Sequence, residues 1–271
     1  MHGQNFLLNQ PLCIDKNYLL SAIPNFILGS QQKSFLTADK IDEKFQSKFN
    51  AQISSAQNSG ANRYPVVIDI IGLIIKYSDW WYTGTQTILQ ILKNIEANEN
   101  ISGVVLNVDS GGGMLSGTPE LADFIFNMQT PTIGFTRGYA CSAGNWILGA
   151  CKHRMASPFA DKIGSIGVFL SYQDFTALFE KYGAKYYEIY APQSTEKNQE
   201  FREMLKGNEK LYQEELRKNA DLFISEMKRF YGDNLKDDGH IFAGKTYNPQ
   251  EAKKIGLIDE LGTLEDALAK F

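Results

Sequence analysis

Residues 104–113, with the sequence VVLNVDSGGG, join a short apolar run to three consecutive glycines. A second small-residue turn, residues 138–144 with the sequence GYACSAG, opens another apolar run further along the chain. Consecutive glycines leave backbone N–H groups uncovered by side chains, so they can bind an anion. A serine flanked by small residues at the start of a helix is reachable and well oriented. We therefore interpret the first turn as a candidate oxyanion hole and Ser142 as a candidate nucleophile.

The composition is that of a soluble globular protein, with 271 residues of which 43% are hydrophobic and 21% are charged. The length allows one large α/β domain or two small ones. A formal net charge of −4, with scattered basic residues, gives no reason to expect a nucleic-acid partner. No window approaches the ~18 uninterrupted apolar residues of a membrane span. We therefore expect an unanchored, cytoplasmic chain with no membrane span.

The cysteine count gives no sign of a disulfide framework or a metal site. The three cysteines, Cys13, Cys141 and Cys151, are irregularly spaced and form no CxxC pair. Such cysteines are usually buried thiols in a reducing compartment. The cysteines therefore argue against both a disulfide framework and a zinc site.

The chain divides into an N-terminal extension with a linker, residues 1–60, and a main domain, residues 61–271. In the extension, a helix is predicted over residues 37–49, with Thr37 as its cap. Residues 52–65 are rich in Ser, Asn, Gln, Ala and Gly, which favours an exposed linker.

The main domain alternates apolar runs with helical patterns. Strands are predicted over residues 66–75, 101–108, 132–135, 154–156, 166–171 and 186–190. Helices are predicted over 83–97, 118–128, 142–150 and 174–182, and a long helical extension over 199–231 with a break near Gly207. This alternation indicates an α/β fold with a mostly parallel sheet, flanking helices and right-handed crossovers. Both glycine turns then fall at the carboxyl ends of strands, where such sheets bind ligands.

A serine nucleophile needs a base to take its proton. The histidines are His2, His153 and His240, and none of them lies in a recognisable motif. A lysine can serve instead if its surroundings lower its pKa toward neutrality. Lys197 follows the strand predicted to end at Tyr190, and so emerges at the same edge of the sheet. Local composition alone favours an exposed surface lysine over a buried base at this position.

Four motifs in order then resemble the S49 peptidase family, of the signal peptide peptidase A and phage protease C type. The resemblance extends from about Tyr64 to Leu268. Residues 109–113, DSGGG, resemble its D-S-P-G-G turn, with glycine in the place of proline. Residues 140–144, ACSAG, resemble its nucleophile turn, and residues 164–168, GSIGV, match a third segment. The closing signature is similar to FAGK at 242–245, Ala252, GLID at 256–259 and LG at 261–262.

The resemblance implies a ClpP/crotonase-like fold and a Ser-Lys dyad that needs neither metal nor cofactor. Ser142 maps onto the nucleophile and Lys197 onto the general base, although the family's K-x-x-G-x-P context is absent around Lys197. Lys185 and Lys206 are the alternatives for the base. Ser165 corresponds to the serine that orients the lysine. The oxyanion is expected to lie against the N–H groups of three residues, namely Gly112, Gly113 and Ala143.

The resemblance also implies a serine endopeptidase that forms oligomers and cuts a polypeptide substrate. Soluble phage members of the family process head proteins, whereas anchored members degrade released signal peptides. Lacking an anchor, the chain is predicted to be a phage or prophage head-maturation protease, acting on capsid or scaffold protein in the host cytoplasm or the prohead. The alternatives are a signal peptide peptidase-like enzyme, a crotonase-type acyl-CoA enzyme, an inactive capsid component, and Cys141 in place of Ser142 as nucleophile.

Overall fold

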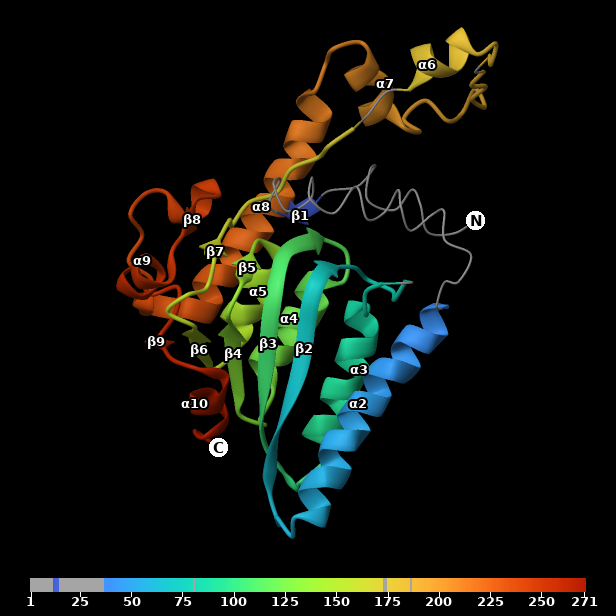
Figure 1. The fold of residues 1–271 in the computed structure, drawn as a ribbon. Helices are drawn as coiled ribbons and strands as arrows, with labels where there is room; N and C mark the ends of the chain where they lie inside the picture. Colours follow the sequence, from blue (N-terminus) through green and yellow to red (C-terminus); the bar gives the residue numbers. More distant parts are fainter. Residues whose placement is uncertain (1–11, 15–36, 80, 173–174, 186) are drawn as a thin grey trace.

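A computed structural model describes residues 12–14, 37–79, 81–172, 175–185 and 187–271 (Figure 1). Its central strand is β3 (Ile101–Met114), which is buried along almost its whole length. The near-continuous apolar run at 104–108 accounts for this, because a strand covered by helices on both faces has no polar side. The other strands are arranged around β3.

The sheet is mostly parallel, as predicted. The strands that run parallel to their neighbours are β2 (Tyr64–Ile74), β4 (Thr132–Thr136), β5 (Tyr139–Cys141), β6 (His153–Ala156), β7 (Lys162–Gly164) and β9 (Glu260–Leu261). The antiparallel ones are β1 (Leu12–Ile14), which pairs with β3, and β8 (Thr246–Tyr247), which pairs with β7.

The two edges of β3 carry different neighbours. β2 follows one edge from Ile101 to Gly113. The opposite edge therefore carries β4 along Val104–Asn107, β5 at Ser110 and β1 along Gly112–Met114, one after another. This succession brings β5 and β1, two separate parts of the chain, to the carboxyl end of β3.

Helices cover the sheet and extend beyond it (Figure 1). The helices that pack in the body are α2 (Ala38–Asn58), α3 (Thr85–Glu96), α4 (Thr118–Asn127), α5 (Ala143–Ala150), α8 (Lys210–Tyr231), α9 (Pro249–Lys254) and α10 (Leu264–Leu268). α5 is entirely buried, and Trp146 on it stacks on Phe223 of α8 with 4.1 Å between the ring centroids. This stacking fixes the helix that follows Ser142.

The linker predicted over residues 52–65 is wrong for its first half, because α2 continues to Asn58. The side-chain amide of Gln52 donates to the carbonyl of Val67 and accepts its N–H, each at 2.8 Å. Phe49 is buried against the core in the same helix. These contacts with β2 override the local polar composition, so part of the predicted extension belongs to the packed body.

The described residues between 170 and 209 form an arm that projects from the body and contains α6 (Thr176–Lys181) and α7 (Gln199–Leu205) (Figure 1). The strand predicted over 166–171 is wrong, since only an isolated bridge at Phe169 is present. Residues 187–190 are likewise not a strand, and residue 186 lies outside the described part. The edge of β7 pairs with β8 instead, and the chain leaves the sheet after Gly164. The predicted break near Gly207 is confirmed.

Candidate functional site

Ser142 stands at the junction of a strand and a helix, one residue after β5 and one before α5. Its φ of 53° and ψ of −117° lie in a region that residues other than glycine rarely adopt. Its N–H donates to the carbonyl of Gly164 at 2.8 Å, which holds the turn in place. Strained residues of this kind concentrate at functional sites, and a serine on a sharp strand-to-helix turn is a known arrangement for a nucleophile.

The two glycine turns are in direct contact. The carboxylate of Asp109 accepts the N–H of Tyr139 at 2.9 Å, and a Cβ atom on Gly138 would come within 2.2 Å of that carboxylate. A Cβ atom on Gly144 would come within 2.8 Å of the carbonyl oxygen of Ser110. Only glycine fits these close approaches. Asp109 therefore joins the turns, a role that sequence reasoning missed although the residue begins the first turn.

The first turn is not the open loop that the sequence predicted, because β3 continues through it to Met114. The Ser110 hydroxyl accepts the N–H of Gly112 at 3.0 Å and donates to the carbonyl of Gly72. The backbone of Gly113 packs directly on that of Ile74 in β2. In this structure the Gly112 N–H thus has a hydrogen-bond acceptor within the chain.

The other residues predicted at the edge do lie around Ser142. Ala143 is the first residue of α5 and is buried. Ser165 follows Gly164 directly, has a φ of 55°, and donates its N–H to the carbonyl of Lys245 at 2.8 Å. The Ser142 hydroxyl lies 3.4 Å from the carbonyl oxygen of Gly167. Segment 164–167 therefore forms one wall beside the serine.

The structure does not bring Lys197 to Ser142 within one chain. Lys197 is exposed in the turn before α7, where its N–H donates to the carbonyl of Ser194 at 3.3 Å. Figure 1 shows this part of the arm well separated from α5. Lys185 and Lys206 are exposed on the same arm, and Lys206 forms an ion pair with Glu203 at 2.8 Å.

The histidines that the structure describes are placed away from Ser142. His153 begins β6, at the amino edge of the parallel strands, and lies 3.2 Å from Glu260 and 3.5 Å from Asp259. His240 is exposed after a polar turn. His2 lies outside the described residues. A Ser-His-Asp arrangement is therefore not formed within the part of the chain that is described.

Cys141 and Cys151 are both buried, as expected. Burial raises the pKa of the Cys151 thiol to about 12, so this group is neutral at physiological pH. The thiol of Cys141 donates to the carbonyl of Lys162 at 3.4 Å. Cys13 is described only through its backbone in β1. Over the described ranges, no group of three or more His, Cys, Asp or Glu side chains is arranged to hold a metal ion.

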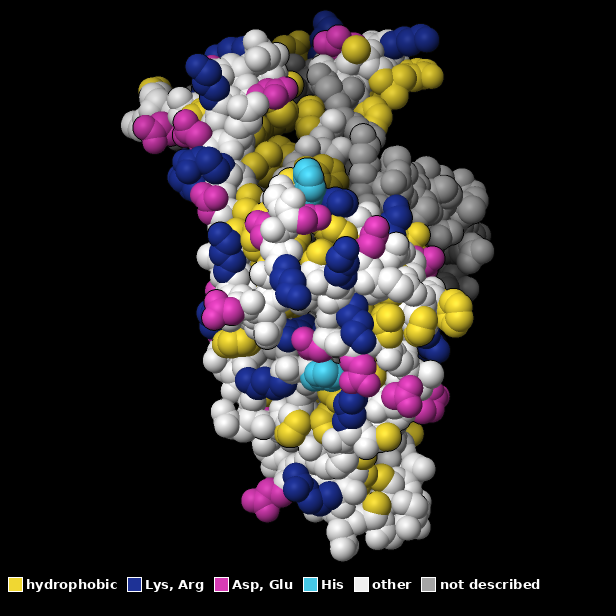
Figure 2. Space-filling view, turned by 90° about the vertical axis from the view of Figure 1, so that its left-hand side faces the viewer, with side chains coloured by type: hydrophobic (Ala, Val, Ile, Leu, Met, Phe, Trp, Pro, Cys, Tyr) yellow, Lys and Arg dark blue, Asp and Glu magenta, His cyan; other side chains and the backbone are white. Residues whose placement is uncertain are grey.

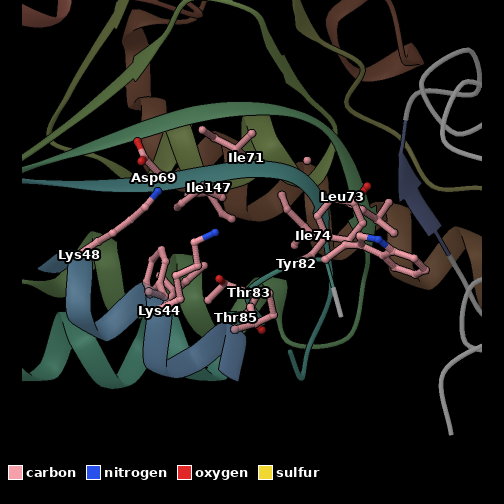
Figure 3. A pocket seen from close by; sticks show the side chains of 16 residues that line it. Lys44, Lys48, Asp69, Ile71, Leu73, Ile74, Tyr82, Thr83, Thr85 and Ile147 are labelled. Carbon is pink, nitrogen blue, oxygen red and sulfur yellow. The ribbon is translucent and has the colours of Figure 1, made fainter. Parts of the chain in front are cut away.

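A cavity of about 290 Å³ lies between α2 and β2 (Figure 3). Lys44 and Lys48 reach into it from α2, and its apolar lining includes Ile74 from β2 and Ile147 from α5. None of its lining residues belongs to either glycine turn. The cavity is therefore separate from the site at Ser142.

Two family models match the chain. The model of peptidase family S49 matches residues 126–271, and that of Clp protease matches residues 73–163. The S49 match includes Ser142 and its turn and covers more than half of the chain. The chain therefore belongs to peptidase family S49, and its mostly parallel, helix-flanked sheet is of the Clp protease kind. The expected class, serine peptidase, is confirmed at the level of the family.

Individual relatives are distant. The chain is 27% identical over 68% of its length to "Putative protease MJ0651" of Methanocaldococcus jannaschii, and 26% identical over 69% to capsid assembly protease C of Escherichia phage lambda. It spans only 59% and 42% of these two proteins. It is 24% identical over 92% of its length to "Putative signal peptide peptidase SppA" of Enterococcus faecium, of which it spans 75%.

The fold also resembles a solved structure. A mutant of the 1510-N membrane-bound stomatin-specific protease superposes with a TM-score of 0.50 at 18% identity, covering 78% of this chain and 85% of that one. This likeness concerns the fold. No helix in the described ranges has the length and apolar character needed to cross a membrane.

Proposed function

We propose that the chain is a serine endopeptidase with Ser142 as nucleophile. The observation that carries the proposal is the strained junction of β5 and α5, which presents Ser142 beside the glycine turn at the carboxyl edge of the sheet. An extended polypeptide substrate, with small or apolar side chains near the cut, lies along the strand edges there. Neither a metal nor a cofactor takes part.

The reaction proceeds through an acyl-enzyme. The neutral amine of Lys197 takes the proton of the Ser142 hydroxyl, whose oxygen attacks the peptide carbonyl carbon. The resulting ammonium protonates the leaving amine as the peptide C–N bond breaks. Water then attacks the ester carbonyl carbon while the lysine amine takes one of its protons. As the ester C–O bond breaks, the lysine gives that proton to the serine oxygen, which frees the acid and restores both residues. Ser165 orients the lysine.

The oxyanion of the tetrahedral intermediate is held by the N–H groups of Gly112, Gly113 and Ala143. One such donor contributes about 3 kcal/mol to transition-state stabilisation. The Gly112 N–H first has to leave the Ser110 hydroxyl that accepts it in this structure. The Ala143 N–H lies at the start of α5, where helix N–H groups are free to bind an anion.

The base comes from the arm of a second copy of the chain. Lys197 is exposed and apart from Ser142 within one chain. The arm also exposes large apolar side chains, including Phe179 at 60% and Ile189 at 96%, and Figure 2 shows hydrophobic side chains gathered at its end. Exposed apolar clusters of this kind mark protein contacts. A homo-oligomer in which the arm packs on a neighbour would bury them and bring in the lysine.

The substrate proposed is a capsid or scaffold protein of a phage or prophage, cut in the host cytoplasm or the prohead. The similarity to capsid assembly protease C of phage lambda supports this choice. A second candidate function is the degradation of released signal peptides. It is supported by the SppA relative, whose alignment covers 92% of this chain. The two candidate functions are distinguished by incubating the enzyme with purified proheads and, in parallel, with a synthetic signal peptide. The substrate that is cut at discrete sites identifies the function.

The deciding experiment is a peptidase assay on the wild type and on Ser142→Ala and Lys197→Ala, with Lys185→Ala and Lys206→Ala as matched controls from the arm. We expect each of the first two variants to lose on the order of 10³-fold or more in kcat, because nucleophile and base act as a unit. The two controls should keep activity. Full activity in Ser142→Ala would sink the proposal, and full activity in Lys197→Ala would move the base elsewhere.

Two further measurements extend this assay. Mixing the Ser142→Ala and Lys197→Ala proteins should restore part of the activity, since a site can then combine Ser142 of one copy with Lys197 of another. No recovery would place both residues of a site in the same chain. A fluorophosphonate should label Ser142 in the wild type. Absence of both labelling and peptidase activity would indicate an inactive capsid component, and cleavage of an acyl-CoA thioester alone would indicate the crotonase class.

A further inference from the structure

The strand β1 lies on the same edge of β3 as the nucleophile. Ile14 pairs with Gly112 and Leu12 with Met114, in antiparallel register. The other edge of β3 is taken by β2, which pairs with the same glycines through Leu73 and Ile74. β1 is therefore on the edge that carries β5, just beyond the end of β5.

β1 runs along β3 toward the end of β5. β5 pairs with β3 through Ala140 and Ser110 and ends at Cys141, directly before Ser142. Gly112 is the residue opposite Ile14. Because β1 runs antiparallel to β3, its chain direction leads from Met114 back toward the nucleophile. Figure 1 shows β1 above the carboxyl ends of β3 and β2.

Ile14 is seated in a small apolar cluster of its own. It is 3% exposed and packs with Leu73, Ile75 and Met114, with the half-buried rings of Tyr82 and Phe169 at the rim. This cluster is separate from the main core. It has the character of a side-chain subsite that receives one aliphatic residue of an extended strand.

A peptide substrate needs this same edge. Extended peptides bind to sheets by adding a strand to an exposed edge, with alternate side chains in pockets. With β1 in place, the edge of β3 from Gly112 to Met114 is paired, and Ser142 is only 1% exposed. Pairing with β1 thus closes this stretch of the edge to a peptide, and the Ser142 hydroxyl, which contacts segment 164–167, is itself buried.

We propose that β1 occupies the position of the substrate strand, so that the N-terminal segment of the chain competes with substrate for the site. Ile14 fills the subsite that takes an aliphatic side chain of the substrate. A strand of three residues is short enough to leave when a longer peptide pairs with the same edge. The proposal rests on the proposed peptidase function for its biological meaning, but strand competition can be measured as binding alone.

The test uses Ile14→Asp in the full-length chain, with Ile14→Val as the conservative control. A carboxylate is unfavourable in the apolar cluster around Ile14, so β1 should detach from β3. The edge of β3 from Gly112 to Met114 is then unpaired. We expect kcat/KM for a fluorogenic peptide with an aliphatic residue to rise about tenfold or more, mainly through a lower KM. Burial of the Ile14 side chain strengthens the binding of β1 by at least about tenfold, and the variant removes this competition. Ile14→Val should behave as the wild type.

A binding measurement keeps the test independent of catalysis. In the Ser142→Ala background, Ile14→Asp should bind a fluorescent, uncleaved peptide about tenfold more tightly than Ser142→Ala alone. A synthetic peptide of residues 9–16, with serine for the cysteine, should displace the fluorescent peptide, and the same peptide with aspartate for its isoleucine should not. Circular dichroism and thermal melting show whether the variants are folded. The two synthetic peptides compare isoleucine with aspartate in the competing strand without any change to Ile14 of the protein itself.

The outcomes separate the two proposals. Equal peptide affinity with and without Ile14→Asp, together with no displacement by the 9–16 peptide, would overturn the role of β1. Inactivity of every variant alongside tighter binding by Ile14→Asp would leave the competing strand standing and count against the peptidase function.

Discussion

The carboxyl edge of the sheet and the arm differ in what holds their residues in place. At the edge, Ser142 is set by the strand before it, the helix after it and backbone contacts with the first glycine turn. On the arm, Lys197 is exposed, and nearby apolar side chains such as Ile189 face solvent. Ser142, the proposed nucleophile, is therefore positioned by contacts within a single chain, whereas Lys197, the proposed base, depends on a further contact. Three predictions test this contrast.

The body should be intolerant of losing its buried ion pair. Arg154 is buried and makes a two-pronged contact with Asp259 at 2.9 and 3.0 Å, over the ring of Tyr231. We expect Asp259→Ala to lower the free energy of unfolding by about 3–5 kcal/mol, because the guanidinium is left buried without its carboxylate. Urea unfolding followed by tryptophan fluorescence measures the loss.

The matched control is Glu260→Gln on the neighbouring position. Glu260 is 40% exposed and pairs with Lys270, so its loss should cost less than about 1 kcal/mol. Equal losses for the two variants would contradict the view that the buried pair holds the body together.

The edge should respond to a single added methyl group. In Gly144→Ala the new Cβ atom would lie 2.8 Å from the carbonyl oxygen of Ser110, so α5 must shift away from the first glycine turn. We expect a loss of about 1–3 kcal/mol in the free energy of unfolding. Displacing Ser142 by about 1 Å should also lower kcat on the order of 100-fold.

The control for this variant is Gly167→Ala, whose Cβ atom would make only an ordinary contact, at 3.7 Å from Gly244. Its stability should stay close to that of the wild type. If Gly144→Ala is as stable and as active as the wild type, the close approach of the two turns does not position the serine.

Substitution on the arm should leave the stability of the single chain unchanged and weaken only the association between chains. Phe179 is 60% exposed, so Phe179→Ser should change the free energy of unfolding of the monomer by no more than about 0.5 kcal/mol. Sedimentation should show weaker association, because the exposed apolar surface is smaller. Unchanged association would remove Phe179 from the proposed contact, and a large loss of stability would show that the arm packs on its own body.

Much of the fold and part of the site could be predicted because they are encoded locally. The apolar run before Asp109 specifies a buried strand, and the small residues around Ser142 specify a strand-to-helix turn. Where prediction was wrong, distant contacts prevailed over local composition. The polar residues after Gln52 stay helical because that side chain pairs with Val67. Residues 166–171 leave the sheet because β8 pairs with β7.

By itself, the sequence determined the nucleophile turn, the glycine turn and the alternation that makes the sheet parallel, since backbone freedom and hydrophobic periodicity depend on neighbouring residues. Only the tertiary structure decided that Ser110 accepts the Gly112 N–H, that Lys197 stands apart from Ser142, and that β1 covers the edge beside it. These outcomes depend on how segments far apart in the sequence pack: the Ser110 hydroxyl donates to the carbonyl of Gly72 in β2, and β1 pairs with β3. Pairing between strands is specified by the whole sheet rather than by any one segment.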